Sequence, residues 1–183
     1  APGMYCDGSN NTEPDGPCLS GYYCFSGCDH PRCTTGVGVG GLCTKGHYCP
    51  NGTHTPIPCP AGTWSSTEGN TKLSDCQPCK GGYYCPVVGI EDPALGDGVD
   101  VDAYLCAVGY YCTSGCQDVL CLTDRGQAAA SGVHDVVGGD CGTGTYCPNG
   151  TAVPLPCEPG TFNPTMRQGS YPICPAGKYC GYA

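Results

Sequence analysis

The sequence predicts a small disulfide-rich fold of tandem cysteine-rich modules, with short β-ribbons and turns, little helix and an elongated shape. Cysteine is the first reason, since it supplies 20 of the 183 residues, above the roughly 8–10% that marks a disulfide scaffold. Glycine and proline are the second, at 31 and 18 residues. The third is that Leu, Ile, Val and Phe together supply only 25 residues. A single large hydrophobic core is therefore excluded, and disulfides must replace it.

A short motif, Cys-x-x-Gly-x-Tyr-Cys, recurs along the chain. The glycine suits a positive φ or the close approach of another strand. The tyrosine offers a large apolar face, which we expect to pack on a disulfide, and the Tyr-Tyr-Cys segments favour two-stranded ribbons. Six full copies begin at Cys18, Cys43, Cys79, Cys106, Cys141 and Cys174, and residues 3–6 are the second half of a seventh.

The motif copies belong to a longer repeat. The cysteines of residues 18–33 recur 88 residues later, and those of residues 43–59 recur 98 residues later. We therefore divide the chain into residues 1–6, the end of a preceding module, 7–85, repeat unit one, 86–180, repeat unit two, and 181–183, the start of a continuation. Modules of this size contact mainly their neighbours, so we expect an elongated body with its termini at opposite ends. Residues 90–103 and 123–140 have few cysteines and should be the least structured.

Segments such as residues 43–63 and 59–85 resemble ephrin-receptor-like cysteine-rich repeats, which are related to the EGF-like and tumour-necrosis-factor-receptor modules. The resemblance covers nearly the whole chain. It implies small disulfide-stapled modules in extracellular array proteins, among them the surface-filament and flagellar-hair proteins of protists. The chain departs from the pattern late in unit two, where Cys174 alone replaces Cys76 and Cys79.

For the disulfides, we expect nine or ten bridges among the 20 cysteines. Cys76 and Cys174 each lie 17 residues after a cysteine, which favours the pairs Cys59–Cys76 and Cys157–Cys174. Cys174 also opens a motif copy, so unit two must close differently or leave a thiol. The partner of Cys6 would fall before residue 1, and Cys180 completes a motif almost at the other end. We expect one of these two to lack an intrachain partner or to contact another chain.

The charge and the remaining residues exclude several functions. A net charge of −9 disfavours nucleic acid and anionic membranes, and no apolar run reaches the ~18 residues that a membrane span needs. The four histidines are scattered, and we expect no metal site, cofactor or catalytic residues. Calcium is a weak alternative at an acidic run, which we expect instead to be a solvated loop. The acidic run consists of Asp92, Asp97, Asp100 and Asp102.

Glycosylation is the strongest chemical signal after the disulfides, with Asn-x-Thr acceptors at Asn10, Asn51 and Asn149. The last two occupy the same place in the long repeat. We expect a glycosylated, non-catalytic protein of the cell surface or extracellular space, not an enzyme. Its expected role is a structural building block of a filament, surface hair or matrix array, in contact with its own copies or neighbouring array proteins. The alternative is a ligand-binding segment of a receptor or adhesion ectodomain, which would have the same motifs.

Overall fold

Short strands and turns form most of the computed structural model, which describes residues 1–8, 12–33, 40–95, 104–121 and 138–180. The only helix in these ranges is the single 3-10 turn η1 (Leu73–Asp75). The chain forms two compact units, one of Ala1–Gln77 with Val87–Asp92 and one of Pro78–Pro86 with Pro93–Ala183. The predicted disulfide-rich fold of strands and turns, nearly without helix, is confirmed.

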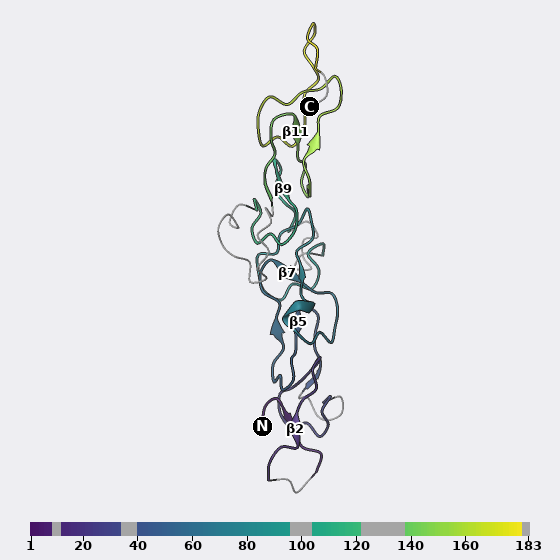
Figure 1. Ribbon diagram of the computed structural model, residues 1–183, viewed down its shortest axis with the longest axis vertical. Helices are drawn as coiled ribbons and strands as arrows, with labels where there is room; N and C mark the ends of the chain where they lie inside the picture. The colour runs from purple at the N-terminus through teal and green to yellow at the C-terminus, as the bar shows by residue number, and fades with distance from the viewer. Residues whose placement is uncertain (9–11, 34–39, 96–103, 122–137, 181–183) are drawn as a thin grey trace. The chain divides into compact units, whose positions relative to one another are not determined.

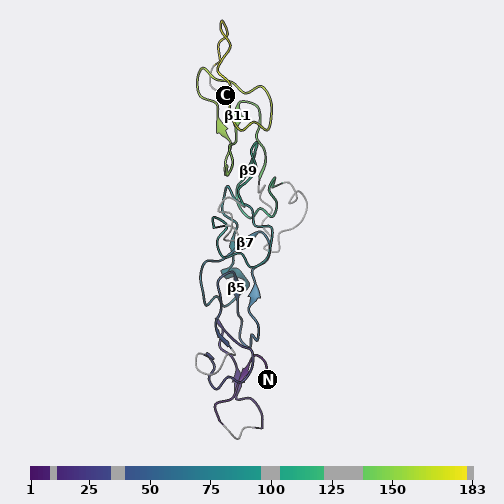
Figure 2. The same ribbon diagram turned by 180° about the vertical axis from the view of Figure 1, so that it is seen from behind.

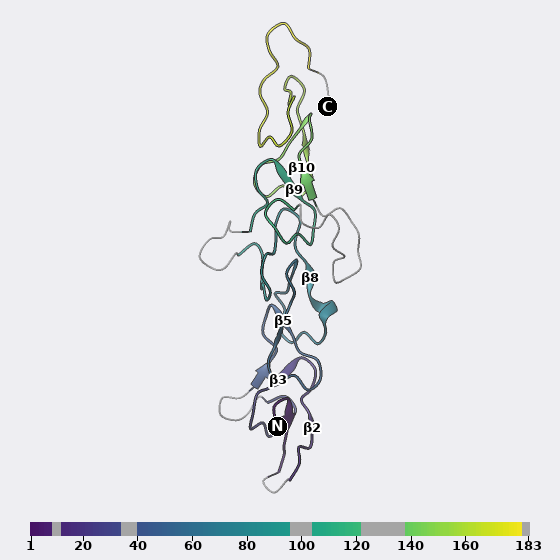
Figure 3. The same ribbon diagram turned by 90° about the vertical axis from the view of Figure 1, so that its left-hand side faces the viewer.

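The first unit contains antiparallel ribbons only two or three residues long (Figure 1). In the second ribbon Tyr23 lies opposite Gly41. The helix η1 is the short coil beside the β8 label in Figure 3. The paired strands are β1 (Met4–Tyr5) with β2 (Gly16–Pro17), β3 (Tyr22–Cys24) with β4 (Gly40–Leu42), β5 (His47–Tyr48) with β6 (Ile57–Pro58), and β7 (Thr63–Trp64) with β8 (Gln77–Pro78).

The second unit repeats the pattern in its green strands (Figure 2). Here β9 (Tyr110–Cys112) pairs with β10 (Gly138–Asp140), and β11 (Thr145–Tyr146) pairs with β12 (Leu155–Pro156). Residues 138–140 were expected to be among the least structured, and this expectation is wrong. A Cβ at Gly138 would lie 2.5 Å from the Cβ of Cys121, so glycine is what allows the strand to pair there. Residues 123–137 of that segment lie outside the described part of the chain.

Sulfur takes the place of an aliphatic core. Among the described residues, the buried hydrophobic side chains are cysteines and Ile90. Ile90 begins the other segment that was expected to be least structured, yet its carbonyl accepts a hydrogen bond from the Ser65 N–H at 3.0 Å. That expectation is therefore wrong at Ile90, while residues 96–103 lie outside the described ranges.

Nine disulfides form, within the predicted nine or ten. Six of them close a motif copy at a separation of 6 residues. The pairs are Cys18–Cys24, Cys28–Cys33, Cys43–Cys49, Cys59–Cys76, Cys79–Cys85, Cys106–Cys112, Cys116–Cys121, Cys141–Cys147 and Cys174–Cys180. Disulfide closure of short loops stabilises a chain that has little apolar surface to bury.

The expected pair Cys59–Cys76 is present, but the expected pair Cys157–Cys174 is wrong. Cys174 is bonded to Cys180, and Cys157 is a buried free thiol. The equal spacing of 17 residues was misleading because Cys174 opens a motif copy, and no cysteine takes the place of Cys76 in unit two. Cys180 is thus paired within the chain, whereas Cys6 is free, as expected for one of the two end cysteines.

Candidate functional site

The most regular feature of the structure is the backbone contact between successive motif copies. At each copy the chain turns through the motif glycine, as at Gly3 and Gly46, where φ is 76° and 70°. A Cβ at Gly3 would overlap the carbonyl of Gly52, and one at Gly46 would overlap the carbonyl of Gly89. These glycines are required both for the left-handed backbone and for the close approach of a second segment.

Two hydrogen bonds then join each copy to the next. The glycine N–H donates to the carbonyl of the last residue of the next copy, and the glycine carbonyl accepts the N–H of that copy's first cysteine. In the first unit the outgoing bonds are Gly3 to Cys24 at 2.7 Å, Gly21 to Cys49 at 2.7 Å and Gly46 to Ser65 at 2.8 Å. The return bonds are Cys18 to Gly3 at 2.9 Å, Cys43 to Gly21 at 2.8 Å and Cys59 to Gly46 at 2.8 Å.

The second unit repeats this hydrogen-bond ladder. Its outgoing bonds are Gly82 to Cys112 at 2.7 Å, Gly109 to Cys147 at 2.8 Å and Gly144 to Asn163 at 2.8 Å. Its return bonds are Cys106 to Gly82, Cys141 to Gly109 and Cys157 to Gly144, each at 2.9 Å. Cys174 also donates to Gly160 at 2.8 Å. The same two-way connection therefore recurs within each unit.

The ladder shows two motif copies that the sequence reasoning did not count. Residues 59–65 and 157–163 keep the first cysteine, the glycine and an aromatic residue, but end in Ser65 and Asn163. These two side chains are only 2% and 4% exposed, in the place of the second cysteine. The Cys-x-x-Gly-x-aromatic spacing would have found both copies, had a second cysteine not been required.

Tyrosines pack on the disulfides, as predicted for the motif. The ring of Tyr5 packs on the buried cluster Cys18, Cys24, Cys28 and Cys33. In the second unit, Tyr84 and Tyr110 pack on the cluster Cys106, Cys112, Cys116 and Cys121. Desolvation by this packing raises the pKa of the Tyr84 hydroxyl, and Tyr104, whose ring lies edge-on at 5.7 Å, raises it further. Tyr5 and Tyr84 thus cover the sulfur core of the next copy, whereas Tyr110 packs on that of its own copy.

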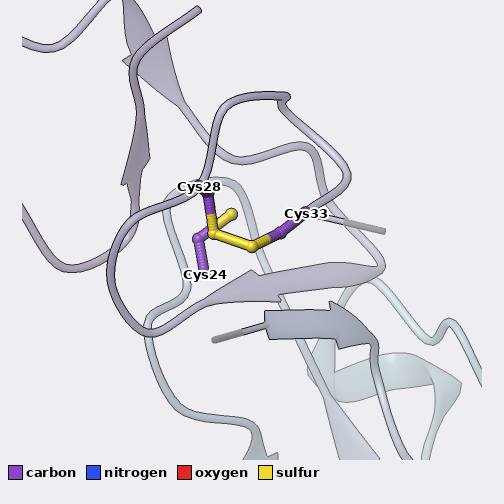
Figure 4. A group of neighbouring side chains, drawn as sticks. All are labelled: Cys24, Cys28 and Cys33. Carbon is purple, nitrogen blue, oxygen red and sulfur yellow. A yellow bond between two sulfur atoms is a disulfide. The ribbon is translucent and has the colours of Figure 1, made fainter. Parts of the chain in front are cut away.

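Within each cluster two disulfides pack against each other. Figure 4 shows the Cys28–Cys33 bond with the Cys24 sulfur beside it, and the three sulfurs lie within 4.8 Å of one another. The equivalent cysteines 112, 116 and 121 form a second such group. This spacing would suit a metal, but each sulfur is in a disulfide and lacks the thiolate that binds zinc. The clusters are better explained as covalent cores.

Two of the predicted glycosylation sites lie in equivalent exposed turns. Asn51 and Asn149 are both exposed. The threonine hydroxyl of each sequon donates to a proline carbonyl three residues earlier at 2.6 Å, from Thr53 in one turn and from Thr151 in the other. Asn51 Oδ1 accepts a hydrogen bond from the Ser20 N–H at 2.7 Å, which leaves its amide nitrogen for a sugar. Asn10 lies outside the described residues.

The other candidate ligands do not gather in the described part of the chain. Of the acidic run, Asp92 is half-buried, while Asp97, Asp100 and Asp102 lie outside the described ranges, so the calcium alternative stays a prediction. His47 lies on β5, where its Nδ1 is 2.8 Å from the Lys45 carbonyl. This contact anchors the side chain locally.

One open cleft of about 330 Å³ lies in the second unit. It is lined by Gly144, Cys157, Thr161, Phe162, Asn163, Pro164, Tyr179 and Cys180. Cys157, whose thiol is free, and Cys180, which is bonded to Cys174, therefore line the same cleft. No sequence pattern pointed to this cleft.

In comparisons with protein-family models and with curated proteins, the chain matches none. Its own features are those of a cysteine-rich repeat module in the general sense, and its disulfide density is typical of an oxidising, secreted or extracellular setting. No helix in the described ranges is long and apolar enough to cross a membrane.

Proposed function

We propose that this protein is a non-catalytic, glycosylated structural building block of an extracellular filament, surface hair or matrix array. Its modules would be a variant of the ephrin-receptor-like cysteine-rich repeat. The observation that carries the proposal is the two-way hydrogen-bond ladder between successive copies, which recurs in both units.

The hydrogen-bond ladder is suited to a structural protein because its contacts are local and repeated. Each full copy is closed by its own disulfide, and within each unit one copy is bonded to the next through the backbone, so stability is distributed over many nearest-neighbour contacts. Such a segment gains strength without a large core and without any one specific surface. A catalyst, in contrast, needs a preorganised group of reactive side chains.

The sequons support the same role. Asn51 and Asn149 lie on exposed turns at equivalent places, so sugars there would repeat along the array. Cys6 supports covalent assembly, because it is free and only half-buried. Its N–H donates to the Cys28 carbonyl at 2.9 Å, as that of the paired Cys85 does to Cys116 at 2.7 Å. Cys6 is thus held as a disulfide cysteine is held.

A ligand-binding ectodomain is the second candidate. The observation that favours it is the exposed aromatic Tyr179, 94% accessible, which lines the cleft with Phe162. Aromatic surfaces of this kind are enriched at binding sites.

The discriminating experiment is assembly of the chain secreted from eukaryotic cells. We expect concentration-dependent linear oligomers by analytical ultracentrifugation and electron microscopy, with a Cys6-dependent covalent band on non-reducing gels that is lost in Cys6→Ser. We also expect glycosidase-sensitive mass on Asn51 and Asn149, lost in Asn51→Gln and Asn149→Gln. A chain that stays monomeric at its highest soluble concentration, with or without Cys6, would contradict the structural role and favour the ectodomain.

A further inference from the structure

Cys157 is a buried thiol, 5% exposed, at the start of a motif copy that has lost its other cysteine. Asn163 stands where the second cysteine of that copy would be, and its side-chain amide donates to the Thr145 carbonyl at 2.7 Å. The equivalent cysteine of unit one, Cys59, avoids the same situation by bonding to Cys76. In unit two there is no cysteine between Cys157 and Cys174 that could take the place of Cys76.

One cysteine of a disulfide lines the same cleft as Cys157. Cys157 and Cys180 are both lining residues, and Cys180 is bonded to Cys174. Two backbone bonds hold this disulfide beside the copy that Cys157 opens. The Cys174 N–H donates to the Gly160 carbonyl at 2.8 Å, and the Gly160 N–H donates to the Cys180 carbonyl at 3.3 Å. Unlike the other disulfide cysteines, which are buried, Cys174 and Cys180 are half-buried.

We propose that Cys157 is an exchange thiol for the Cys174–Cys180 disulfide. The Cys157 thiolate attacks the Cys180 sulfur, a Cys157–Cys180 bond forms, and the Cys174–Cys180 bond breaks with its electron pair leaving on Cys174. The Cys174 thiolate then takes up the proton that Cys157 released. The number of thiols and of disulfides is unchanged, so the step needs no external oxidant or reductant.

The consequence is a change in which cysteine is reactive. Before exchange the free thiol of this region is buried at Cys157, and after exchange it is at the half-buried Cys174. Solvent access is one of the main determinants of thiol reactivity. The region therefore holds a concealed thiol that becomes available for a bond to another molecule only after exchange. This inference stands on the cleft and does not depend on the assembly proposed above.

The test uses the full chain carrying Cys6→Ser, in which Cys157 is the one remaining free cysteine. The protein is incubated between about pH 6 and pH 9, a range that spans the usual thiol pKa of ~8.5. It is then quenched in acid and alkylated under denaturing conditions, and the labelled and disulfide-linked peptides are identified by mass spectrometry. We expect a constant total of one thiol per chain, with label moving from Cys157 to Cys174 and a Cys157–Cys180 peptide appearing. The rate should rise with pH because the attacking species is a thiolate.

The matched control is Cys157→Ser in the same background, which should keep the Cys174–Cys180 bond and show no label at Cys174. The pH series of the Cys6→Ser chain does not depend on that second variant, so the proposal stays testable if the chain with Cys157→Ser folds poorly. Label confined to Cys157 at every pH would overturn the proposal. A Cys157–Cys174 peptide would overturn the assignment of Cys180 as the sulfur under attack.

Discussion

Residues 59–85 and residues 157–180 begin and end with the same motif pattern, but they differ in whether the first cysteine forms a disulfide. Both open with Cys-x-x-Gly-x-aromatic and end in a full motif copy closed by a disulfide. In the first, the 3-10 turn η1 leads into Cys76, which bonds to Cys59. In the second, both the turn and the cysteine are missing, and Cys157 stays free. A second disulfide is thus not needed for the hydrogen-bond ladder to form.

A shorter segment before Cys174 explains why the second region lacks the turn and the cysteine. Cys79 lies ten positions after Gly69, but Cys174 lies only seven positions after the equivalent Arg167. The shorter segment places Tyr171 against Tyr146, with ring centroids 4.6 Å apart in an edge-to-face arrangement. Such a pair contributes about 0.5–1.5 kcal/mol. This is less than the contribution expected from the Cys59–Cys76 disulfide of the first region. Desolvation raises the pKa of the Tyr171 hydroxyl, and Glu158 adds to this effect.

A second difference keeps a contact and changes its chemistry. In the first unit Leu42 covers Gly69, and its Cδ1 would lie 3.2 Å from a Cβ there. Ninety-eight residues later the same two positions are Asp140 and Arg167, which form an ion pair at 3.0 Å. The Arg167 guanidinium also lies 5.4 Å from the Tyr110 ring centroid. The backbone geometry at this position is thus compatible with an apolar or a charged pair, provided that both members change together.

The largest expected difference between the two regions concerns the disulfide. Cys59→Ser with Cys76→Ser opens a loop with a sequence separation of 17 residues, and we expect a loss of about 3 kcal/mol of stability. Cys157→Ser removes no bond, and we expect a loss of about 1 kcal/mol or less. Urea unfolding, with the fluorescence of the single Trp64 reporting on the first region and hydrogen exchange on the second, checks both values. Equal losses would show that Cys157 has a structural partner.

The next largest effect concerns the motif glycine. We expect Gly46→Ala to cost about 2–3 kcal/mol, because φ is positive and the new Cβ would overlap the Gly89 carbonyl. Gly160→Ala has the same sign of φ but no atom within 4 Å of the new Cβ, and should cost about 1–2 kcal/mol. Thermal or urea unfolding of the two variants separates the close approach from the backbone preference. Equal costs would mean that the contact with Gly89 relaxes freely.

A smaller effect concerns the buried amide of Asn70, which follows the degenerate copy of the first region. Asn70 Nδ2 donates to the Ser65 hydroxyl at 2.8 Å and to the His47 carbonyl at 3.0 Å. Asn70→Ala leaves these groups without their donor, so we expect a loss of about 1–2 kcal/mol. The side chain of Gln168, 98 residues later, donates to the nearby Met166 carbonyl, and Asn163 donates to the Thr145 carbonyl in its place, so Gln168→Ala should cost less than about 0.5 kcal/mol. Hydrogen exchange at residues around each site measures both, and a costly Gln168→Ala would contradict the comparison.

Most of the disulfides follow from the sequence because Cys-x-x-Gly-x-Tyr-Cys encodes both the turn and the covalent closure. The cleft and the free thiol could not be predicted, because they depend on which of two roles Cys174 takes. The spacing from Cys157 favoured a Cys157–Cys174 bond, whereas the motif favoured a Cys174–Cys180 bond. The backbone hydrogen bond from Cys174 to Gly160 decides in favour of the second. The degenerate copies were missed for a related reason, since Ser65 and Asn163 preserve the fold of the motif without its sulfur.

The smallest expected difference is the pH response of the turn that only the first region has. The Asp75 carboxylate accepts hydrogen bonds from the Thr71 N–H at 2.8 Å and the Lys72 N–H at 3.2 Å, and the bond from Thr71 is the main cause of its lowered pKa. A lowered pKa in the folded state means that the stabilisation is present above the unfolded value of about 3.9 and is lost as the pH falls through the folded value. Residues 168–173 contain no carboxylate. We therefore expect the protection factors for hydrogen exchange around η1, each taken against the intrinsic rate at the same pH, to fall below about pH 4, to lose this pH step in Asp75→Asn, and to show no such step near Tyr171. An Asp75→Asn variant that keeps the acid-induced step would assign the effect to another group, because an asparagine side chain does not titrate in this range.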